Sequence, residues 1–190
     1  MNNTSKIHIK NMVCPRCVMA VQHILARCGI EPIRVELGWA EISDVLDDKT
    51  YDALRCALEE YGFEVLEDPQ KTLVDAIRVA VIKRIHYTED QNSDNLSEYL
   101  SQEFHRDYSS LSKLFSEING MSIERYYLLQ RIERVKELLS YGELSVSEIA
   151  DQLHFSSVAH LSAQFRNITG YSPTAFRHLK ENPLKSLDEI

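Results

Sequence analysis

Hydrophobic positions in the first 68 residues follow two periods. Apolar and polar residues alternate over short stretches, as in half-buried strands, and the segments between them repeat their apolar residues at helical spacing. Strands are predicted at 6–10, 33–37, 40–43 and 63–65, and helices at 15–28 and 48–61. Gly38 offers a hairpin turn, and Leu54, Leu58 and Tyr61 are expected on the inner face of the second helix. The order β-α-β-β-α-β predicts a ferredoxin-like domain of the α+β class.

Beyond residue 68 the pattern is helical throughout. Asp68 and Pro69 interrupt the strand pattern, and the segment 73–87 places large aliphatic residues at helical spacing. Residues 88–95 are polar and are expected to form a loop. The segment 122–140 has an apolar stripe opposite a polar side, which predicts one long linker helix. The polar side consists of Arg131, Glu133, Arg134 and Lys136.

An internal repeat with a shift of 50 residues organises this helical part. Residues 95–126 align with residues 145–176 without a gap. The identical pairs are Ser97/Ser147, Glu98/Glu148, Gln102/Gln152, Leu111/Leu161, Ser112/Ser162, Phe115/Phe165, Ile118/Ile168, Gly120/Gly170 and Ser122/Ser172. Two copies are too few for a solenoid, which needs at least three repeats. The repeat therefore indicates two similar supersecondary units.

Each copy has the sequence signals of a helix-turn-helix motif. A capping box is expected at its start, formed by Asn95 with Glu98 and by Ser145 with Glu148. A short helix, a turn and a second helix follow, and a glycine ends the second helix. The chain therefore predicts an all-α second domain with two helix-turn-helix motifs joined by the linker helix.

Several segments of the repeat match a known family in order and spacing. They are 145–155, 161–165, 169–173 and 176–177 in the second copy, and 111–115 and 120–123 in the first. The second copy, with its Thr-Gly-x-Ser-Pro sequence at 169–173, closely resembles the second half of the AraC/XylS-type DNA-binding domain. The first copy resembles the first motif of that domain, and 73–87 resembles its leading helix. The resemblance covers roughly residues 75–180.

The resemblance implies a sequence-specific bacterial transcription regulator and no enzymatic activity. In that family each motif places one helix in a major groove of double-stranded DNA, on successive turns of the same face. It also implies RNA polymerase and a second copy of the chain as candidate partners. By position, the DNA-binding residues would be Ser109, Ser112, Lys113, Ala159, His160, Ser162, Ala163, Gln164, Arg166 and Arg177. His178 is a further candidate for phosphate contact, and Ala163 stands where Arg or Lys is common in the family.

Charge limits how such a chain would hold DNA. The net charge is −8, and from Asp75 onward 13 Lys and Arg residues face 17 Asp and Glu residues. This balance excludes a polybasic, nonspecific binder. Contacts would have to come from a local patch, and binding would weaken steeply with salt.

Cys14 and Cys17 form a CxxC pair where the first strand meets the first helix. Together with Met12 and the strand order, the pair resembles the heavy-metal-associated domain of copper chaperones, over about residues 5–68. Two thiolates suit a soft ion such as Cu(I), and suit Zn less well. The helix N-terminus and the adjacent Arg16 are expected to favour thiolate. Two alternatives stay open: a redox couple, or a degenerate site on a dimerisation domain.

The predicted division of the chain follows from both resemblances. Residues 1–68 would form an HMA-like sensor domain, 69–94 a connecting helix and loop, 95–180 the double helix-turn-helix domain, and 181–190 a tail. No apolar run approaches the ~20 residues of a membrane span, and the N-terminus is polar, so a cytoplasmic protein without a membrane partner is expected. No cofactor is required by this account. The rival hypothesis is a metal chaperone or buffer with a helical interaction module.

Overall fold

The structure is a computed structural model that describes residues 4–43, 45–87, 95–179, 184–188 and 190. The chain divides into two compact units. The first comprises Met1–Ala80 with Asn95–Asn119, and the second comprises Val81–Asp94 with Gly120–Ile190. The loop predicted at 88–95 lies almost wholly outside the described residues. The domain boundaries drawn from the sequence stay predictions, and each unit is treated separately below.

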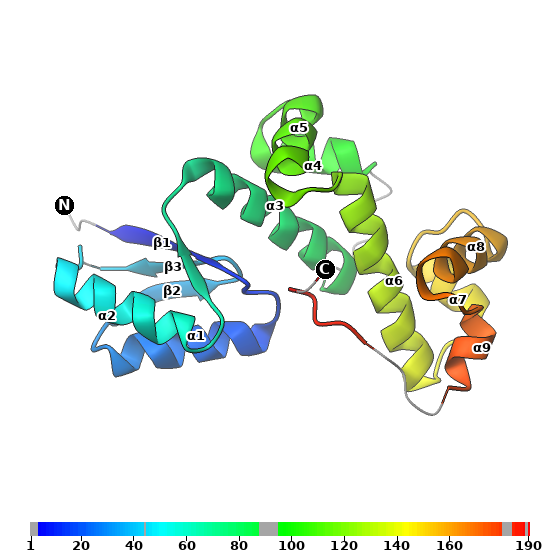
Figure 1. The fold of residues 1–190 in the computed structure, drawn as a ribbon, viewed down its shortest axis with the longest axis horizontal. Coiled ribbons are helices and arrows are strands. Elements are labelled where there is room, and N and C mark those ends of the chain that lie inside the picture. Colours follow the sequence, from blue (N-terminus) through cyan, green and yellow to red (C-terminus); the bar gives the residue numbers. More distant parts are fainter. Residues whose placement is uncertain (1–3, 44, 88–94, 180–183, 189) are drawn as a thin grey trace. The chain divides into compact units, whose positions relative to one another are not determined.

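The first unit begins with a small antiparallel sheet covered on one face by two helices (Figure 1). The elements are β1 (Ser5–Lys10), α1 (Pro15–Arg27), β2 (Pro32–Glu36), β3 (Trp39–Ile42), α2 (Asp48–Glu59) and β4 (Glu64–Leu66). The strand order in the sheet is β2-β3-β1-β4. Ile9 and Ile42 from the sheet pack with Leu25 of α1 and Leu54 of α2 in one buried cluster. Burial of this single face explains the alternation seen in the strands.

Two side chains of this sheet domain do not lie where the pattern placed them. Ile33 is 55% exposed because the β2–β3 register shifts between Pro32 and Arg34, and a bulge of this kind changes which face the next residue takes. Tyr61 was expected on the inner face of α2, yet it is 52% exposed because the helix ends at Glu59. Leu54 and Leu58 are buried as predicted.

The helices of the sheet domain start at residues that satisfy their first N–H groups. The Asp47 carboxylate accepts a hydrogen bond from the Thr50 N–H at 2.7 Å, which caps α2. Pro15 occupies the first turn of α1, where its missing N–H costs nothing. These local signals explain why the pattern located both helices.

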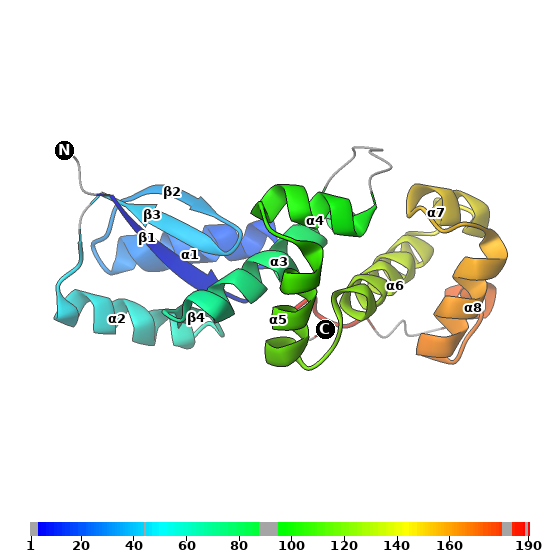
Figure 2. The same cartoon turned by 90° about the horizontal axis from the view of Figure 1, so that it is seen from above.

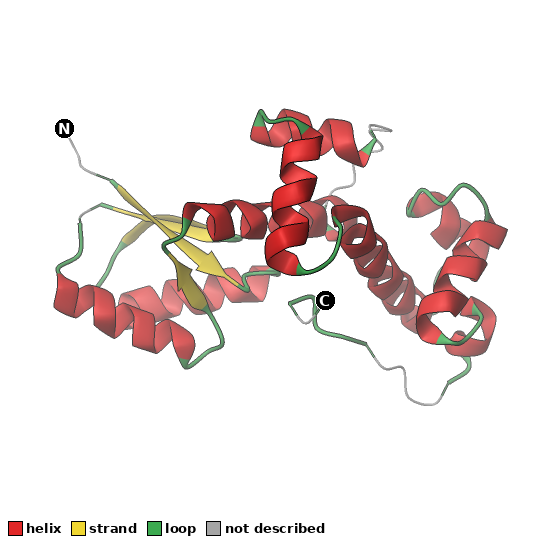
Figure 3. Cartoon of the chain, turned by 45° about the horizontal axis from the view of Figure 1, so that its top comes forward, coloured by secondary structure: helices red, strands yellow, loops and turns green. Residues whose placement is uncertain are grey.

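The rest of the first unit is helical (Figure 3). Helix α3 (Pro69–His86) begins after Asp68, whose carboxylate accepts from the N–H groups of Gln70 and Lys71 at 2.7 and 3.2 Å. Its first part, as far as Ala80, belongs to this unit. The unit is completed by α4 (Leu96–Phe104) and α5 (Tyr108–Asn119), with Leu100, Leu111 and Phe115 buried.

The described residues of the second unit form the end of α3 and four further helices (Figure 2). They are α6 (Ile123–Tyr141), α7 (Val146–Gln152), α8 (Val158–Thr169) and α9 (Pro173–Arg177). Ile132, Val135 and Leu139 of α6 share a core with Leu161 and Phe165 of α8. The long linker helix predicted at 122–140 is therefore confirmed as α6.

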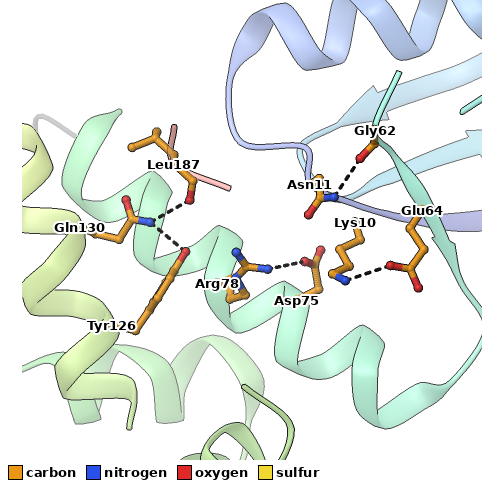
Figure 4. A network of polar contacts seen from close by, with 9 residues as sticks. All are labelled: Lys10, Asn11, Gly62, Glu64, Asp75, Arg78, Tyr126, Gln130 and Leu187. Carbon is orange, nitrogen blue, oxygen red and sulfur yellow. Dashed lines mark hydrogen bonds and ion pairs between the residues drawn. The ribbon is translucent and has the colours of Figure 1, made fainter. Parts of the chain in front are cut away.

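The polar side of α6 is partly buried, contrary to the sequence prediction. Glu133 and Lys136 are only 7% and 6% exposed and form an ion pair at 2.6 Å. The backbone N–H of Lys185 donates to the second Glu133 oxygen at 3.1 Å. Gln130, also buried, donates to the Tyr126 hydroxyl and to the Leu187 carbonyl oxygen (Figure 4). Residues 185–187 therefore cover a part of α6 that the helical pattern assigned to solvent.

Among the described residues, no helix is both long and apolar enough to cross a membrane.

Candidate nucleic-acid interface

The sequence repeat is reproduced in the positions of the helices. Helices α4 and α7 begin at residues 96 and 146, and α5 and α8 span 108–119 and 158–169. Helices α6 and α9 begin at residues 123 and 173. Each of these positions in the first copy lies 50 residues before its counterpart in the second copy. We call α4–α5 the first motif and α7–α8 the second motif; each is a helix, a turn and a second helix.

The first helix of each motif is capped, though in different ways. Ser145 and Glu148 form a full capping box: the Ser145 hydroxyl accepts from the Glu148 N–H, and the Glu148 carboxylate accepts from the Ser145 N–H at 2.7 Å. Asn95 instead accepts from the N–H of Ser97, at 3.3 Å. The side-chain acceptor therefore bonds one residue earlier than the capping box predicted for the first copy.

The turns of the two motifs also differ by one residue. His105 follows α4 with a left-handed backbone, φ 50°, whereas His154 takes this conformation in the second motif, φ 54°. Phe155 then turns inward and is buried under the Arg131 guanidinium, 3.7 Å from the ring centroid. Arg131 also donates to the Leu153 carbonyl oxygen at 2.5 Å. Arg131 thus joins the turn between α7 and α8 to α6.

Helix α5 presents three predicted DNA-binding residues. Ser109 and Lys113 are exposed, and Ser112 is half-buried. The Lys113 side chain is 78% exposed, and its ammonium lies 4.0 Å from a Glu117 carboxylate oxygen. The Ser109 hydroxyl donates to Asp107 at 3.3 Å. A charged end group on this exposed face can reach a base edge or a phosphate.

A cleft of about 410 Å³ lies beside Lys113, between α5 and the start of α3. It is lined by Pro69, Gln70, Leu73, Arg106, Ser110, Lys113, Leu114 and Glu117. Arg106 precedes α5 and is exposed. Arg106 is not among the residues predicted from the sequence, because only its position in the turn places it next to Lys113.

Helix α8 presents the second set of predicted residues. Ala159, His160, Ala163 and Arg166 are exposed, while Ser162 and Gln164 are half-buried. The Ser157 hydroxyl caps α8 by accepting from the His160 N–H at 3.0 Å. This second set has a single cationic side chain, that of Arg166. The hydrogen-bonding side chains of this set other than Arg166 are His160, Ser162 and Gln164.

Ser156 is a residue of this surface that the sequence analysis missed. Its hydroxyl lies 2.9 Å from Nδ1 of His160. Ser156 and His160 are four residues apart, a spacing that brings side chains together on a helix. Ser156, however, lies in the turn before α8 begins. Helical periodicity therefore gave no reason to pair it with His160.

Arg177 has partners inside the second unit. Its guanidinium donates to the Leu144 carbonyl oxygen, and its Nε is buried without a hydrogen-bond partner among the described residues. The side chain is half-buried at the end of α9, whereas His178 next to it is exposed. The contact with Leu144 ties α9 to the loop before α7. A DNA contact by Arg177 stays a prediction.

The Thr-Gly-x-Ser-Pro sequence has a structural explanation. The Thr169 hydroxyl donates to the Phe165 carbonyl oxygen at 2.8 Å and accepts from the Tyr171 N–H at 3.2 Å. Gly170 has a φ of 82°, a left-handed conformation that glycine adopts without strain. Ser172 then caps α9, with Pro173 in its first turn. The sequence ends one helix and starts the next within four residues.

The thiol pair lies at the start of α1. The sulfur atoms of Cys14 and Cys17 are 3.3 Å apart, and both residues are half-buried. Met12 is fully buried. Asn11 has a φ of 70°, a conformation that Asn tolerates better than most residues, and its amide donates to the Gly62 carbonyl oxygen at 2.9 Å (Figure 4). The loop before the thiols is thereby tied to the segment before β4.

Burial raises the pKa of the Cys17 thiol, and the neighbouring Cys14 adds to the rise. This direction is opposite to the expectation drawn from the helix N-terminus and Arg16. The reason is that loss of hydration penalises the thiolate more than the nearby N–H groups stabilise it. Within the part of the chain that the structure describes, no three His, Cys, Asp or Glu side chains are grouped as a metal site. Metal binding by Cys14 and Cys17 stays a prediction.

Asp75 is a buried acid on helix α3 that pairs with Arg78 of the same helix (Figure 4). One carboxylate oxygen lies 4.0 Å from Arg78, and a Cβ placed on Gly38 would lie 3.9 Å from the other. Burial raises the pKa of Asp75 to about 6, although Arg78 and Lys10 act in the opposite direction. Lys10 itself pairs with Glu64 at 2.9 Å. Asp75 is thus a buried acid at the contact between α3 and the β2–β3 turn.

Comparison with known proteins agrees with the geometry of the motifs. Residues 100–178 match the family model described as "Helix-turn-helix domain". The Msm operon regulatory protein of Streptococcus mutans is 28% identical over 132 residues, which are 70% of this chain and 46% of that protein. An uncharacterized HTH-type transcriptional regulator of Staphylococcus aureus is 26% identical over 172 residues, 90% of this chain and 22% of that protein. The chain therefore spans less than half the length of either relative.

Among solved structures, the DNA-binding domain of AdpA, the global transcriptional factor, in complex with a target DNA, is similar at a TM-score of 0.44 and 24% identity. The similarity covers 58% of this chain and 91% of that one. The family match includes most of the first motif, the linker helix α6 and the whole second motif. Residues 100–178 are therefore similar to a helix-turn-helix domain.

Proposed function

We propose that the chain is a sequence-specific, double-stranded DNA-binding transcription regulator of the AraC type. The repeat supports this most directly, because the helices of two helix-turn-helix motifs begin at equivalent positions at a shift of 50 residues. Each motif leaves an exposed face on its second helix, and a helix of this size fits the major groove. The names of the relatives agree with this function.

The two second helices offer different chemistry to DNA. Helix α5 offers Lys113, a point charge suited to a guanine edge or a phosphate, with Ser109 and Ser112 beside it. Helix α8 offers His160, Ser162 and Gln164, which are suited to hydrogen bonds with base edges. Arg166 would add a phosphate contact. Arg177 would add another if its guanidinium gave up the Leu144 carbonyl oxygen for a phosphate oxygen. Each motif would thus supply one cation from its second helix, Lys113 or Arg166, and the second motif would add the hydrogen-bonding groups of His160, Ser162 and Gln164.

Selection of duplexes from a randomised library tests the proposal. The whole chain should enrich one sequence, and Lys113→Ala and His160→Ala should each weaken binding to it. Lys49→Ala is the matched control, because Lys49 is an exposed lysine on α2, outside both motifs. Failure of the wild-type chain to enrich any sequence would contradict the proposal. Equal binding by Lys49→Ala and Lys113→Ala would remove Lys113 from the interface.

We also propose that Cys14 and Cys17 respond to a soft metal ion or to oxidation. Their sulfur atoms are in contact, and the pair lies next to the buried Met12. The two thiols fit an ion of low coordination number such as Cu(I) better than Zn²⁺, whose structural sites use four ligands. Cu(I) would supply a soft cation that replaces the thiol protons. Because burial raises the pKa of Cys17, this binding should strengthen as the pH rises.

Titration of the reduced protein with Cu(I) against a competing chelator tests the thiol proposal. Binding should be lost in Cys14→Ser/Cys17→Ser and retained in Cys56→Ser, which removes an exposed thiol on α2. DNA affinity is measured on the same samples with and without the ion. Unchanged Cu(I) binding in the double variant would refute the site. Cu(I) binding without any change in DNA affinity would refute its regulatory role.

The rival hypothesis is a metal chaperone or buffer whose helices contact another protein. It gains support if duplex selection enriches nothing and Cu(I) passes from Cys14 and Cys17 to an acceptor. We propose further that residues 1–68 are ferredoxin-like in fold and HMA-like in origin, a view supported by the position of the thiol pair between β1 and α1. RNA polymerase and a second copy of the chain remain the proposed partners.

A further inference from the structure

His160 is held on the surface of α8 by three contacts within the second motif. Its Nδ1 atom lies 2.9 Å from the Ser156 hydroxyl. Its ring meets the edge of the Phe155 ring, with centroids 5.8 Å apart and planes at 76°. Its backbone N–H donates to the Ser157 hydroxyl at 3.0 Å. The two contacts of the ring, with Ser156 and Phe155, restrict the rotation of an exposed side chain.

The support beneath the imidazole is itself rigid. Phe155 is buried, and the Arg131 guanidinium lies 3.7 Å from its ring centroid. Arg131 extends from α6 and also donates to the Leu153 carbonyl oxygen. The position of the His160 ring is therefore set by the turn between α7 and α8 and by α6, as well as by its own helix.

We propose that Ser156 is a positioning residue that orients His160, so that the Nε2 atom faces a hydrogen-bond acceptor on DNA. This inference rests on the proposed DNA-binding function. Nδ1 is occupied by Ser156, and Nε2 has no hydrogen-bond partner among the residues that the structure describes. The remaining nitrogen of an exposed, fixed ring is the atom available to a ligand.

With Nδ1 bonded to Ser156 in the way proposed, Nε2 donates outward whether or not the ring is protonated. When the Ser156 hydroxyl donates to Nδ1, the neutral ring has its proton on Nε2, which then donates outward. When the ring is protonated, Nδ1–H donates to Ser156, and Nε2–H again donates outward. The acceptor is then guanine N7 or O6, thymine O4, adenine N7, or a phosphate oxygen.

The first motif has no equivalent of this pair. At a shift of 50 residues, Arg106 corresponds to Ser156, and Ser110 corresponds to His160. Both of these first-motif residues line the cleft beside Lys113. The oriented imidazole therefore distinguishes the second motif from the first. The half of the DNA site that faces α8 should be the half whose preference depends on Ser156.

The first test needs no DNA. In the free protein, nitrogen NMR of the His160 ring reports which nitrogen has the proton in the neutral form. The proposal expects the proton on Nε2 and a hydrogen-bonded Nδ1, whose signal shifts in Ser156→Ala. A proton on Nδ1, or a Nδ1 signal that is the same in wild type and in Ser156→Ala, would overturn the proposal that Ser156 orients His160.

The second test is a double-mutant cycle on the selected duplex. His160→Ala should weaken binding about 5- to 150-fold, and Ser156→Ala about 2- to 10-fold. The variant lacking both side chains should bind like His160→Ala alone, because Ser156 acts through the ring. Ser156→Thr keeps the hydroxyl and should restore affinity, and Ser147→Ala is the control, since Ser147 is exposed on α7. Losses that multiply in the double variant would mean that Ser156 contacts DNA itself, and would overturn the proposal.

Binding of the same variants to different duplexes shows whether the acceptor of His160 is a base or a phosphate. If His160 donates to a base, Ser156→Ala lowers discrimination at one base pair; if it donates to a phosphate, affinity falls equally on all sequences. Either pattern supports the orienting role of Ser156, and no change in affinity on any duplex overturns it. A wild-type chain that binds no duplex contradicts the proposed function instead, and the NMR result on the free protein separates the two failures.

Discussion

Glu133 and Lys136 form a buried ion pair on α6, with 2.6 Å between the carboxylate oxygen and the ammonium nitrogen. The second carboxylate oxygen of Glu133 accepts from the backbone N–H of Lys185. The pair thus joins one turn of α6 to a segment 52 residues away in the sequence. A buried carboxylate with a cation and an N–H donor is well satisfied, whereas the same carboxylate without its cation is costly.

Replacing only the cation of this pair should strongly destabilise the second unit. Lys136→Met leaves the Glu133 charge buried, and we expect the free energy of unfolding to fall by about 3 to 5 kcal/mol. The combined variant Glu133→Gln/Lys136→Met keeps an acceptor for Lys185 and should recover most of the loss. Denaturant unfolding measures both, with Lys49→Met as an exposed control expected within about 0.5 kcal/mol of wild type. A single variant as stable as the control would contradict burial of the pair.

Asp75 should make the stability of the protein fall as the pH rises from about 4 to about 6. Because the Asp75 side chain is buried, its pKa is about 6 in the folded state, against 3.8 for an aspartate exposed to water. The folded state therefore holds this proton more tightly than the unfolded state does. Stability from this group is present below pH 4 and is lost as the pH passes 6.

The variant Asp75→Asn isolates this effect. Relative to the variant, wild type should lose up to about 3 kcal/mol of unfolding free energy between pH 4 and pH 7. The facing charges are Arg78 and Lys10, which lower the pKa, and Glu64, which raises it. Urea unfolding at both pH values measures the difference between the two proteins. A difference that stays constant with pH would show that Asp75 is ionised without penalty in the folded state.

The capping box of α7 should contribute to the stability of the second motif. Ser145→Ala removes the acceptor for the Glu148 N–H, and a loss of about 1 kcal/mol is expected. Ser147→Ala, two residues further along the same helix, makes the same chemical change at an exposed position and should have little effect. Thermal unfolding of the two variants side by side provides the comparison. Equal midpoints would mean that the cap makes no net contribution.

Glu117 should oppose DNA binding through Lys113. Its carboxylate lies 4.0 Å from the lysine ammonium on the same exposed face of α5. Glu117→Gln removes a negative charge next to the DNA and should strengthen binding, whereas Lys113→Ala should weaken it by about 1 to 3 kcal/mol if it contacts a base. If Lys113 meets only a phosphate, its removal should lower the salt slope by about one. Binding isotherms at several salt concentrations decide this, and unchanged binding by Glu117→Gln would place this face of α5 away from the phosphates.

The elements that the sequence predicted well are those with local signals. Ser145 caps α7, Gly170 ends α8, and Asp47 caps α2, each through bonds within a few residues. The repeat supported the prediction of these helices, because the helices of the two copies begin 50 residues apart. The small sheet and the helical second part followed from the period of the apolar residues.

The features that the sequence did not predict depend on distant partners. Ile33 turns outward because the register of β2 against β3 shifts, and register is a property of the pair of strands. Glu133 and Lys136 were assigned to solvent because nothing in α6 itself shows that residues 185–187 lie over them. At the interface, Ser156 was missed because the turn brings it to His160, whereas exposed positions on α5 and α8 could be counted from the helical period.

Hydroxyl-radical footprinting on the selected duplex tests the central claim most directly. If both motifs enter the major groove as proposed, two protected segments should lie about 10 base pairs apart on one face of the DNA. His160→Ala should weaken protection of one segment, and Lys113→Ala should weaken the other. A single protected segment that both variants weaken equally would contradict reading by two motifs, and no protection at all would contradict specific DNA binding.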